Sequence, residues 1–289
     1  MKVAIVATVK DEVSDIGAFL QAIELQTRKP DMVVIVDGGS KDGTWAALRA
    51  WDWGDRANVE TLIMLRPCNR SRGRNMAADL AMKQGAEVLA FTNVSEPLMS
   101  WLDVLVRPIE GGLADMVGGS WLVNAHGTRE AAMALLTQFT SDQLDISKIS
   151  ALNMAITADA FKHVGGFDPD LDTSEDTDFT LAADALGVKM AFEPKAVVVW
   201  RPATLTLRGA VKTYYQFAMT DGKARLMSDQ YVLTYLAYLM FPLLPVWLLL
   251  RVRKVLRARL LRQVPLALAA AVAMDVARMV GYARGRLGR

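Results

Sequence analysis

Over residues 3–123, short apolar runs alternate with stretches of helical periodicity, and this alternation constrains the fold more than any other feature. Runs rich in Val and Ile predict strands at 3–8, 32–37, 59–65, 88–92 and 116–123. The segments between them predict helices at 14–27, 42–51, 72–84 and 98–107. Strands and helices that alternate at this spacing form βαβ units with right-handed crossovers. The sequence therefore predicts an α/β fold with a mainly parallel sheet flanked by helices.

Residues 124–230 follow a looser pattern. It predicts helices at 128–140, 158–164 and 176–186, and strands at 188–193 and 196–200. We expect this half to add strands to the sheet and to build the wall that faces an acceptor.

The predicted strand at 32–37 ends in Asp37, which is followed by Gly38-Gly39-Ser40-Lys41-Asp42-Gly43-Thr44. Open α/β folds bind ligands at the carboxyl ends of their parallel strands. The glycines permit a tight turn, and Ser40 or Asp42 can cap the next helix. Asp37 is suited to accept hydrogen bonds from a base edge or from ribose hydroxyls. An ordinary strand-to-helix turn explains the same residues equally well, so both interpretations stay open.

Two other polar segments lie at strand ends or helix starts. The first follows the first strand and contains Thr8, Lys10 and Glu12. The second opens a helix with three arginines at alternate positions, followed by an amide: Arg70, Arg72, Arg74 and Asn75. Guanidinium groups and helix N-termini both suit a diphosphate. The alternative is a solvated loop in the first case and an exposed basic loop in the second.

A second acidic turn follows the pair Gly165-Gly166. Residues 168–178 hold six carboxylates, and Glu175 and Asp176 stand where a helix begins. Mutual repulsion raises some carboxyl pKa values toward the working range of a general base. Glu175 and Asp176 are therefore the best candidates for acid/base chemistry. A solvated acidic loop, with Asp176 as a helix cap, is the competing interpretation.

Taken together, residues 3 to about 230 resemble a family 2 glycosyltransferase of the GT-A fold. The stretches that match, in order, are Val6–Glu12, Val34–Thr44, Arg72–Ala77, Asn153–Asp168 and Glu175–Phe179. The resemblance implies an inverting transfer of a sugar from a nucleotide diphosphate donor. It also implies that Asp37 contacts the nucleoside and that Asp176 is the base. Such a base deprotonates the acceptor hydroxyl while a cation or arginines stabilise the departing diphosphate.

The predicted site has two parts. The catalytic pair is Asp176 and Glu175. The nucleotide-sugar-binding residues are Thr8, Lys10, Glu12, Asp37, Gly39, Arg72, Arg74, Asn75 and Asn93.

One departure from the family pattern concerns the metal. The family usually carries an acidic Asp-x-Asp motif after the fourth strand, which binds a divalent cation such as Mg²⁺ or Mn²⁺. Here that place reads Asn93-Val94-Ser95-Glu96. Asn93 and Ser95 offer neutral oxygens, which are weaker ligands for a hard cation than carboxylates. Either Glu96 helps, or the arginines near 70–74 carry the leaving-group charge, or activity is reduced, and the sequence does not choose among these.

Three further residues are candidates for the acceptor or diphosphate side. Trp200 and Arg201 end the last predicted strand, where Trp200 can stack on a sugar ring or close the core. Tyr215 lies in 205–227, a Tyr-rich stretch similar to the one that follows the catalytic core in membrane-associated relatives. We interpret this stretch as an amphipathic helix at the membrane surface, with packing against the core as the alternative.

Charge separates the body of the chain from its tail. Residues 231–289 carry ten of the 33 Lys and Arg but only one of the 31 Asp and Glu, so the body is mildly acidic. A nucleic-acid-binding protein needs a basic face on its folded body, which argues against a nucleic acid polymer as partner. A basic, apolar tail suits an anionic membrane surface. The apolar run at Val3–Val9 is too short for an export signal, so we expect the catalytic body to be cytosolic.

The tail predicts membrane association. Tyr231–Leu250 is an uncharged run of about the length of a membrane span, and six Lys or Arg follow within 251–262. A single crossing would place those positives opposite the cytosolic body, against the positive-inside tendency. Pro242 and Pro245 also interrupt the run. We therefore favour a re-entrant or monotopic attachment, with a second crossing at 264–282 as the alternative, which is costly unless Asp275 and Arg278 pair or face protein.

These observations predict a division of labour along the chain. Residues 1–123 form the nucleotide-sugar-binding half and 124–230 the acceptor half of a GT-A domain, and 231–289 form a membrane-associating helical tail. The predicted acceptor is a lipid-linked or envelope glycan, as in polysaccharide biosynthesis at the cell envelope. The competing function is a non-catalytic, sugar-nucleotide-binding or scaffolding relative that has lost its metal motif.

Overall fold

A computed structural model describes residues 1–52, 59–137, 149–171, 173–224 and 244–287. The chain divides into two compact units. We call Met1–Leu122 with Ser141–Trp200 the sheet unit, and Val123–Thr140 with Arg201–Arg289 the helical unit. This division follows compactness, whereas the predicted boundary at residue 230 concerns function and stays a prediction.

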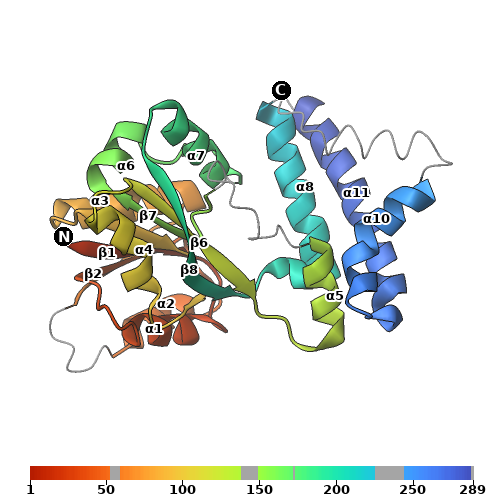
Figure 1. Cartoon of the computed structure of the whole chain (residues 1–289), viewed down its shortest axis with the longest axis horizontal. Coiled ribbons are helices and arrows are strands. Elements are labelled where there is room, and N and C mark those ends of the chain that lie inside the picture. The colour runs from red at the N-terminus through yellow and green to blue at the C-terminus, as the bar shows by residue number, and fades with distance from the viewer. Residues whose placement is uncertain (53–58, 138–148, 172, 225–243, 288–289) are drawn as a thin grey trace. The chain divides into compact units, whose positions relative to one another are not determined.

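The sheet unit, shown in Figure 1, is built on a mixed, mostly parallel sheet. Within the described residues this sheet has eight strands in the order β3-β2-β1-β4-β7-β6-β8-β5. Strands β3, β2, β1 and β4 run parallel to one another, whereas β7 is antiparallel to β4 and to β6, and β5 is antiparallel to β8. Their bounds are β1 Val3–Val9, β2 Met32–Asp37, β3 Glu60–Leu65, β4 Val88–Thr92, β5 Glu96–Pro97, β6 Met116–Val123, β7 Asn153–Thr157 and β8 Met190–Trp200. The predicted α/β class is confirmed.

Both faces of the sheet are buried. Along β1, the odd positions from Val3 to Val9 enter one apolar cluster, and Ala4 and Val6 enter the other, as the two-residue period of a strand requires. Helices α1 and α4 cover the first face, and α3, α6 and α7 contribute to the second. The helices of the sheet unit are α1 Ile16–Glu24, α2 Thr44–Ala50, α3 Arg70–Lys83, α4 Trp101–Glu110, α6 Ala158–Val164 and α7 Glu175–Ala185.

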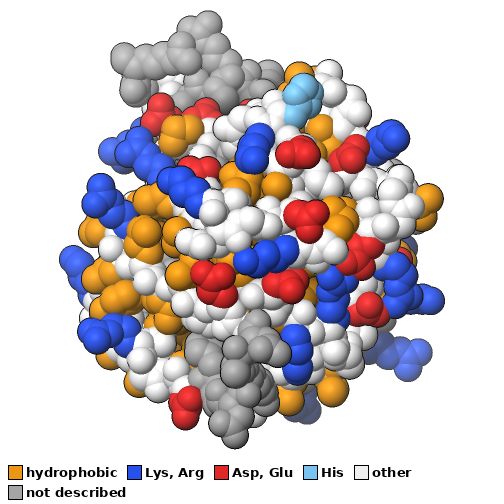
Figure 2. All heavy atoms as spheres, turned by 90° about the vertical axis from the view of Figure 1, so that its left-hand side faces the viewer, with side chains coloured by type: hydrophobic (Ala, Val, Ile, Leu, Met, Phe, Trp, Pro, Cys, Tyr) orange, Lys and Arg blue, Asp and Glu red, His pale blue; other side chains and the backbone are white. Residues whose placement is uncertain are grey.

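The face shown in Figure 2 intersperses acidic and basic side chains, and neither sign of charge predominates on it. A mixed distribution of this kind is typical of a solvated surface. This face therefore offers no broad field of one charge as a candidate site.

The helical unit forms around its own apolar core. Its described elements are α5 Gly127–Thr137, the 3-10 turns Ala203–Leu205 and Leu261–Gln263, α8 Leu207–Ala224, α10 Leu244–Arg257 and α11 Val264–Leu287. Ala210 and Tyr214 of α8 pack with Val252 of α10 and Met274 of α11. A Cβ at Gly281 would lie 2.4 Å from the carbonyl oxygen of Tyr215, so this glycine permits the close approach of α8 and α11. The apolar side of α8 thus packs against protein, which is the alternative to the membrane-surface helix expected for 205–227.

The predicted membrane segment lies only partly within the described residues. Residues 231–243 fall outside them, and 244–250 form the start of α10. Among the described residues, one helical stretch, Leu261–Leu287, is long and apolar enough to cross a membrane, and 44% of its most apolar window is buried. That stretch contains the expected alternative span at 264–282.

Three charged residues of the tail are paired inside the helical unit. Asp275 is fully buried, and its carboxylate accepts a hydrogen bond from Trp247 Nε1 at 3.1 Å. Its Oδ1 lies 3.4 Å from Arg251 Nη2 and 3.7 Å from Arg278 Nη1. The guanidinium of Arg278 also stacks over the Tyr214 ring at 4.8 Å. The sequence alone suggested that Arg251 is one of six surface charges. In the structure its side chain is instead largely buried.

Candidate active site

The Asp37 turn lies at the carboxyl end of β2. Asp37 is fully buried, and its Oδ1 accepts hydrogen bonds from the backbone N–H groups of Gly39 at 2.9 Å and Ser40 at 2.7 Å. Gly39 has φ of +93°, a conformation that glycine adopts without strain. Oδ2 is buried and has no hydrogen-bond partner among the described residues. One oxygen of Asp37 thus fixes the turn, and the other is left for a donor outside the described structure.

Thr8 lies at the corresponding end of the neighbouring strand β1. A Cβ at Gly73 would lie 2.4 Å from Thr8 Cγ2, so this glycine lets the first turn of α3 approach β1 closely. Within the described ranges, Thr8 Oγ1 is buried without a hydrogen-bond partner, like Asp37 Oδ2. Lys10 is exposed just beyond, and its side chain lies near Gly38. Two adjacent strand ends therefore carry unsatisfied buried oxygens.

Helix α3 begins with the predicted arginines. Asn69 caps it, since its side-chain oxygen accepts the Arg72 backbone N–H at 2.9 Å. Arg70 and Arg72 then occupy the first turn and Arg74 follows directly, near the positive end of the helix dipole, which disfavours cations. A local conflict of this kind is expected at a functional site. A bound anion would relieve it, because helix N-termini and guanidinium groups both attract negative charge.

The first turn of α3 is bonded to the second acidic turn, about a hundred residues away in sequence. Asn75 exchanges two hydrogen bonds with the Phe167 backbone, at 2.7 and 2.9 Å. Arg72 donates to the Pro169 carbonyl at 3.1 Å, and Ser71 donates to the Leu171 carbonyl at 2.7 Å. The predicted diphosphate turn and the predicted catalytic turn are therefore parts of one structure. The Asn75 side chain fixes the second acidic turn through its hydrogen bonds to the Phe167 backbone.

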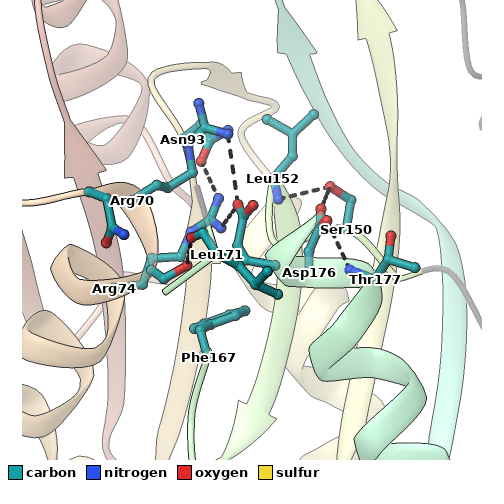
Figure 3. A network of polar contacts seen from close by, with 12 residues as sticks. Arg70, Arg74, Asn93, Ser150, Leu152, Phe167, Leu171, Asp176 and Thr177 are labelled. Carbon is teal, nitrogen blue, oxygen red and sulfur yellow. Dashed lines mark hydrogen bonds and ion pairs between the residues drawn. The ribbon is translucent and has the colours of Figure 1, made fainter. Parts of the chain in front are cut away.

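A buried ion pair joins the two turns at their centre (Figure 3). Arg74 donates from Nη1 to Glu175 Oε1 at 2.5 Å and from Nη2 to Asn93 Oδ1 at 2.9 Å. The side chains of Arg74 and Glu175 are only 2% and 3% exposed. Burial lowers the pKa of the Arg74 guanidinium, and the nearby Glu175 carboxylate opposes that shift. Arg70 Nη1 adds a second cation, 3.7 Å from the same Glu175 oxygen.

Asp176 follows Glu175 but has a different environment. It is half-buried, and its Oδ2 accepts a hydrogen bond from the Ser150 hydroxyl at 2.8 Å. Its Oδ1 accepts from the Thr177 backbone N–H at 2.9 Å. Ser174, just before the pair, has φ of +62°, a strained conformation that persists only where the surrounding structure imposes it. Of the two predicted catalytic carboxylates, Asp176 is the accessible one, and Glu175 is enclosed by arginines.

Sequence reasoning did not identify Ser150 as a partner of this site. Ser150 stands three residues before Asn153, at the start of a matched stretch, but its position alone does not indicate a carboxylate partner. The Ser150 hydroxyl holds Asp176 and also accepts the Leu152 backbone N–H at 3.3 Å. It fixes the direction in which the carboxylate points.

Asp178 also departs from an ordinary carboxyl. Burial, and secondly the Asp168 charge, raise its pKa. Repulsion among the clustered carboxylates, expected from the sequence, is therefore a real but secondary cause at this position.

Glu12 is the most strongly perturbed carboxyl among those with a resolved shift. Burial, with a smaller contribution from Asp15, raises its pKa from 4.5 to about 7, and Arg70 opposes the shift. The folded protein then binds more protons at Glu12 than the unfolded chain does between about pH 4.5 and 7. The free energy of unfolding contributed by this group therefore falls as pH rises through that window and is constant above it.

We accordingly expect Glu12→Gln to make stability less dependent on pH between 5 and 7 and to stabilise the protein at pH 8. Urea unfolding at several pH values measures both effects. Asp15→Asn is the matched control, because Asp15 is a secondary cause of the shift and its loss should flatten the curve less. An unchanged pH dependence in Glu12→Gln would contradict the assignment.

The residues at the expected metal position do not fit a hard divalent cation. Asn93 Oδ1 is engaged by Arg74, and the Ser95 hydroxyl lies within hydrogen-bond distance of Thr92 Oγ1 at 3.0 Å and the Asn93 carbonyl at 3.3 Å. Glu96 is exposed on the short strand β5. In the described part of the chain, no group of three His, Cys, Asp or Glu side chains is placed to hold a metal ion. The oxygens of Asn93 and Ser95 are already used within the protein.

The three residues expected on the acceptor or diphosphate side have different surroundings. Trp200, at the end of β8, packs against the core of the sheet unit. Arg201 belongs to the helical unit and donates from Nη2 to Glu130 Oε1 at 2.7 Å. Tyr215 lies on α8, and its hydroxyl accepts from Arg284 Nη1 at 3.2 Å. Their roles toward an acceptor stay predictions.

Residues 4–162 match the sequence model of glycosyl transferase family 2. This range is more than half of the chain and includes the Asp37 turn, the start of α3 and the Asn93 loop. A search of curated protein sequences gave no match.

Solved structures share the fold at low sequence identity. TarS 1–349 from S. aureus aligns with a TM-score of 0.55 and 15% identity over 100% of this chain and 92% of that one. The complex of TarS 1–349 with UDP-GlcNAc aligns with a TM-score of 0.54 and 15% identity, over 100% and 93%. The mannosyltransferase PcManGT from Pyrobaculum calidifontis, in complex with GDP-Man and Mn²⁺, aligns with a TM-score of 0.56 and 18% identity, over 96% and 75%.

Proposed function

This chain belongs to glycosyl transferase family 2, and on that premise we propose that it transfers a sugar, with inversion, from a nucleotide diphosphate donor to a lipid-linked or envelope glycan at the cytosolic membrane face. The observation that carries the proposal is the buried Arg74–Glu175 pair. It joins the arginine-rich start of α3 to the start of α7, so that cations for a leaving group and a carboxylate base belong to one rigid network.

The donor is expected at the carboxyl ends of β1 and β2. Asp37 Oδ2 and Thr8 Oγ1 supply buried oxygens that lack protein partners in the described ranges. A nucleoside offers the matching groups, since base N–H and ribose O–H groups are donors. The start of α3 would receive the diphosphate, because its arginines and helix dipole both favour an anion. TarS and PcManGT were solved with UDP-GlcNAc and with GDP-Man respectively, which supports this class of donor.

Asp176 is the proposed general base. It takes the proton from the acceptor hydroxyl, whose oxygen attacks the anomeric carbon as the bond from that carbon to the diphosphate oxygen breaks. The electron pair of that bond leaves with the nucleotide diphosphate. Arg70 and Arg72 lie beside the start of α3, where their charge opposes the negative charge that develops on the leaving group. Glu175 neutralises and orients Arg74 rather than exchanging protons.

A divalent cation is an expected cofactor of family 2, and PcManGT was solved with Mn²⁺. Because Asn93 and Ser95 are engaged inside this protein, we assign leaving-group stabilisation to the arginines and route no step through a metal.

The acceptor and the membrane context are proposed from the tail. We propose that residues 1–230 act as the glycosyltransferase domain and that 231–289 hold it at an anionic membrane surface. The basic excess of the tail and its long apolar helix support this division. A membrane-bound enzyme meets its lipid-linked acceptor in two dimensions, which fits an acceptor of that class.

The test of this function is a panel of UDP and GDP sugars with the purified full chain. We expect one donor to be bound and slowly hydrolysed without an acceptor, and transferred when a lipid-linked acceptor is added. Addition of EDTA should leave donor binding unchanged if arginines replace the metal. Donor binding without hydrolysis or transfer would instead support the non-catalytic alternative. The observation that favours this alternative is the hydrogen bond from Arg74 to Asn93 Oδ1, which leaves that oxygen engaged within the protein.

Asp37→Asn should weaken binding of the nucleotide diphosphate by roughly tenfold or more, as expected when a hydrogen bond to a buried charged group is lost. The amide keeps an acceptor for the Gly39 and Ser40 N–H groups but replaces the free oxygen by a donor. Truncation to Ala is less clean, because Asp37 is buried and its Oδ1 fixes the turn. Isothermal titration with UDP and GDP measures the effect.

Asp42→Asn is the matched control in the same turn. Both oxygens of Asp42 accept backbone N–H groups, from Thr44 and Val13, and the Thr44 hydroxyl bond is the main reason its pKa is lowered. Its replacement should leave nucleotide affinity unchanged. Equal losses in the two variants would reduce Asp37 to a structural turn residue.

A further inference from the structure

Helix α11 carries an unbroken apolar stripe along its exposed side. The stripe consists of residues spaced three or four apart, each exposed and apolar: Pro265, Ala269, Val272, Val276, Val280, Ala283 and Leu287. Val276 and Val280 are 43% and 54% exposed. At 1.5 Å per residue the stripe runs for about 33 Å. Contiguous exposed apolar surface of this kind marks interaction sites more often than scattered single residues do. No described residue covers it.

Two charged residues near the middle of α11 lie on the other side of the helix. Asp275 and Arg278 are buried against α8 and α10, where they contact Trp247, Arg251 and Tyr214. These contacts within the protein therefore offset the desolvation penalty of burying the two charges. The stripe itself contains no polar side chain, so its surroundings can be entirely apolar.

Helix α8 limits how this stripe can meet a membrane. It packs along α11, from Tyr214 against Arg278 to Ala218 against Tyr282. On its outer side α8 exposes three polar residues at four-residue spacing: Arg208, Lys212 and Gln216. If α11 crossed a bilayer, α8 would lie at the same depth, and an exposed Lys212 in hydrocarbon is strongly unfavourable. If the stripe contacts lipid, α11 therefore has to lie along the membrane surface rather than cross the bilayer.

Charge decides between lipid and a second copy of the chain. Exposed arginines flank the stripe at both ends: Arg253, Arg257, Arg259 and Arg262 before it, and Arg284 and Arg286 near its end. Asp275, which is buried, is the only acid in 244–287. Two copies that met through this face would bring like charges together. Anionic headgroups around an acyl layer would match both the arginines and the stripe.

We propose that α11 lies in the plane of an anionic bilayer and that its apolar stripe is the face that enters the acyl layer. This inference rests on the proposed membrane attachment and specifies its surface. It moves the principal lipid contact from 231–250, where the sequence places it, to 265–287.

The first experiment measures binding of the full chain to vesicles of equal parts phosphatidylglycerol and phosphatidylcholine. The double variant Val276→Glu/Val280→Glu should lower the partition coefficient at least about tenfold, because two charges enter an apolar layer. Gln216→Glu adds a charge on the outer side of α8 and should change it little. Circular dichroism and thermal melting of all variants check that the helical unit remains folded.

The second experiment measures depth and does not depend on destabilising variants. Single cysteines at 269, 276 and 283, in a Cys68→Ser background, carry a bimane label that is quenched by lipids labelled at known depths. An in-plane helix gives similar, shallow depths at the three positions. A gradient with 276 deepest would establish a crossing and overturn the proposal.

Three other outcomes would also test the proposal. Wild-type protein that binds no vesicle would refute the membrane attachment itself. Wild-type binding that the Glu double variant leaves unchanged would refute only the role of the stripe. Light scattering that shows a dimer, separated by Val276→Glu, would assign the stripe to a second copy and overturn the lipid proposal.

Discussion

Asp176→Asn is expected to lower the turnover number for sugar transfer by about 10²–10⁴-fold, the usual cost of losing a general base. The affinity for the donor should stay within a few fold, because the base acts on the acceptor hydroxyl and not on the nucleotide. The amide preserves the size of the side chain. Its one oxygen can still accept a hydrogen bond, from either the Ser150 hydroxyl or the Thr177 backbone N–H. Single-turnover kinetics with saturating donor separate the chemical step from binding.

Two controls make this result specific. Asp178→Asn changes a carboxylate in the same first turn of α7, and the resulting loss of turnover should be small. Ser150→Ala leaves Asp176 charged but frees one oxygen, so we expect an intermediate loss of turnover and a shifted pH profile, which a purely structural role would not produce. If the Asn variant keeps more than about a tenth of wild-type turnover, Asp176 is not the base.

The sequence predicts the sheet well because its strands are buried on both faces. Runs such as Val3–Val9 and Met32–Asp37 are short, nearly continuous and rich in Val and Ile, which is typical of strands buried on both faces. The predicted strands 188–193 and 196–200 are instead one strand, β8, with Pro194 inside it. On the side of β8 that faces β5, the paired residues are Val198 and Val199, so Pro194 lies outside that ladder.

The site was predictable residue by residue but not as a network. Glycines, a terminal carboxylate and a helix start indicate the Asp37 turn, because local backbone geometry requires those residue types. No local sequence pattern predicts that Arg74 contacts both Glu175 and Asn93, since pairing across long sequence separations depends on how the elements pack. The same holds for Arg251, which looks like a surface charge in sequence and is buried against Asp275.

The second large effect concerns the ion pair itself. Glu175→Gln should lower the free energy of unfolding of the sheet unit by about 3–5 kcal/mol, because it leaves the buried Arg74 charge without a counterion. Arg74→Met should cost a similar amount, since Glu175 would then retain only Arg70 at 3.7 Å. Urea unfolding followed by tryptophan fluorescence measures both variants. Asp170→Asn, in the exposed pair with Arg72, should have no measurable effect.

The double variant Arg74→Met/Glu175→Met separates the stability of the pair from its function. Removing both charges leaves no uncompensated ion, so the double variant should be more stable than either single variant predicts. Donor affinity and turnover should nevertheless stay low, because α3 has lost a cation and the link to the start of α7 is gone. Full additivity of the two single losses would mean that the residues act independently. Recovery of activity together with stability would mean that the pair only fills space, and that Arg70 and Arg72 alone oppose the leaving-group charge.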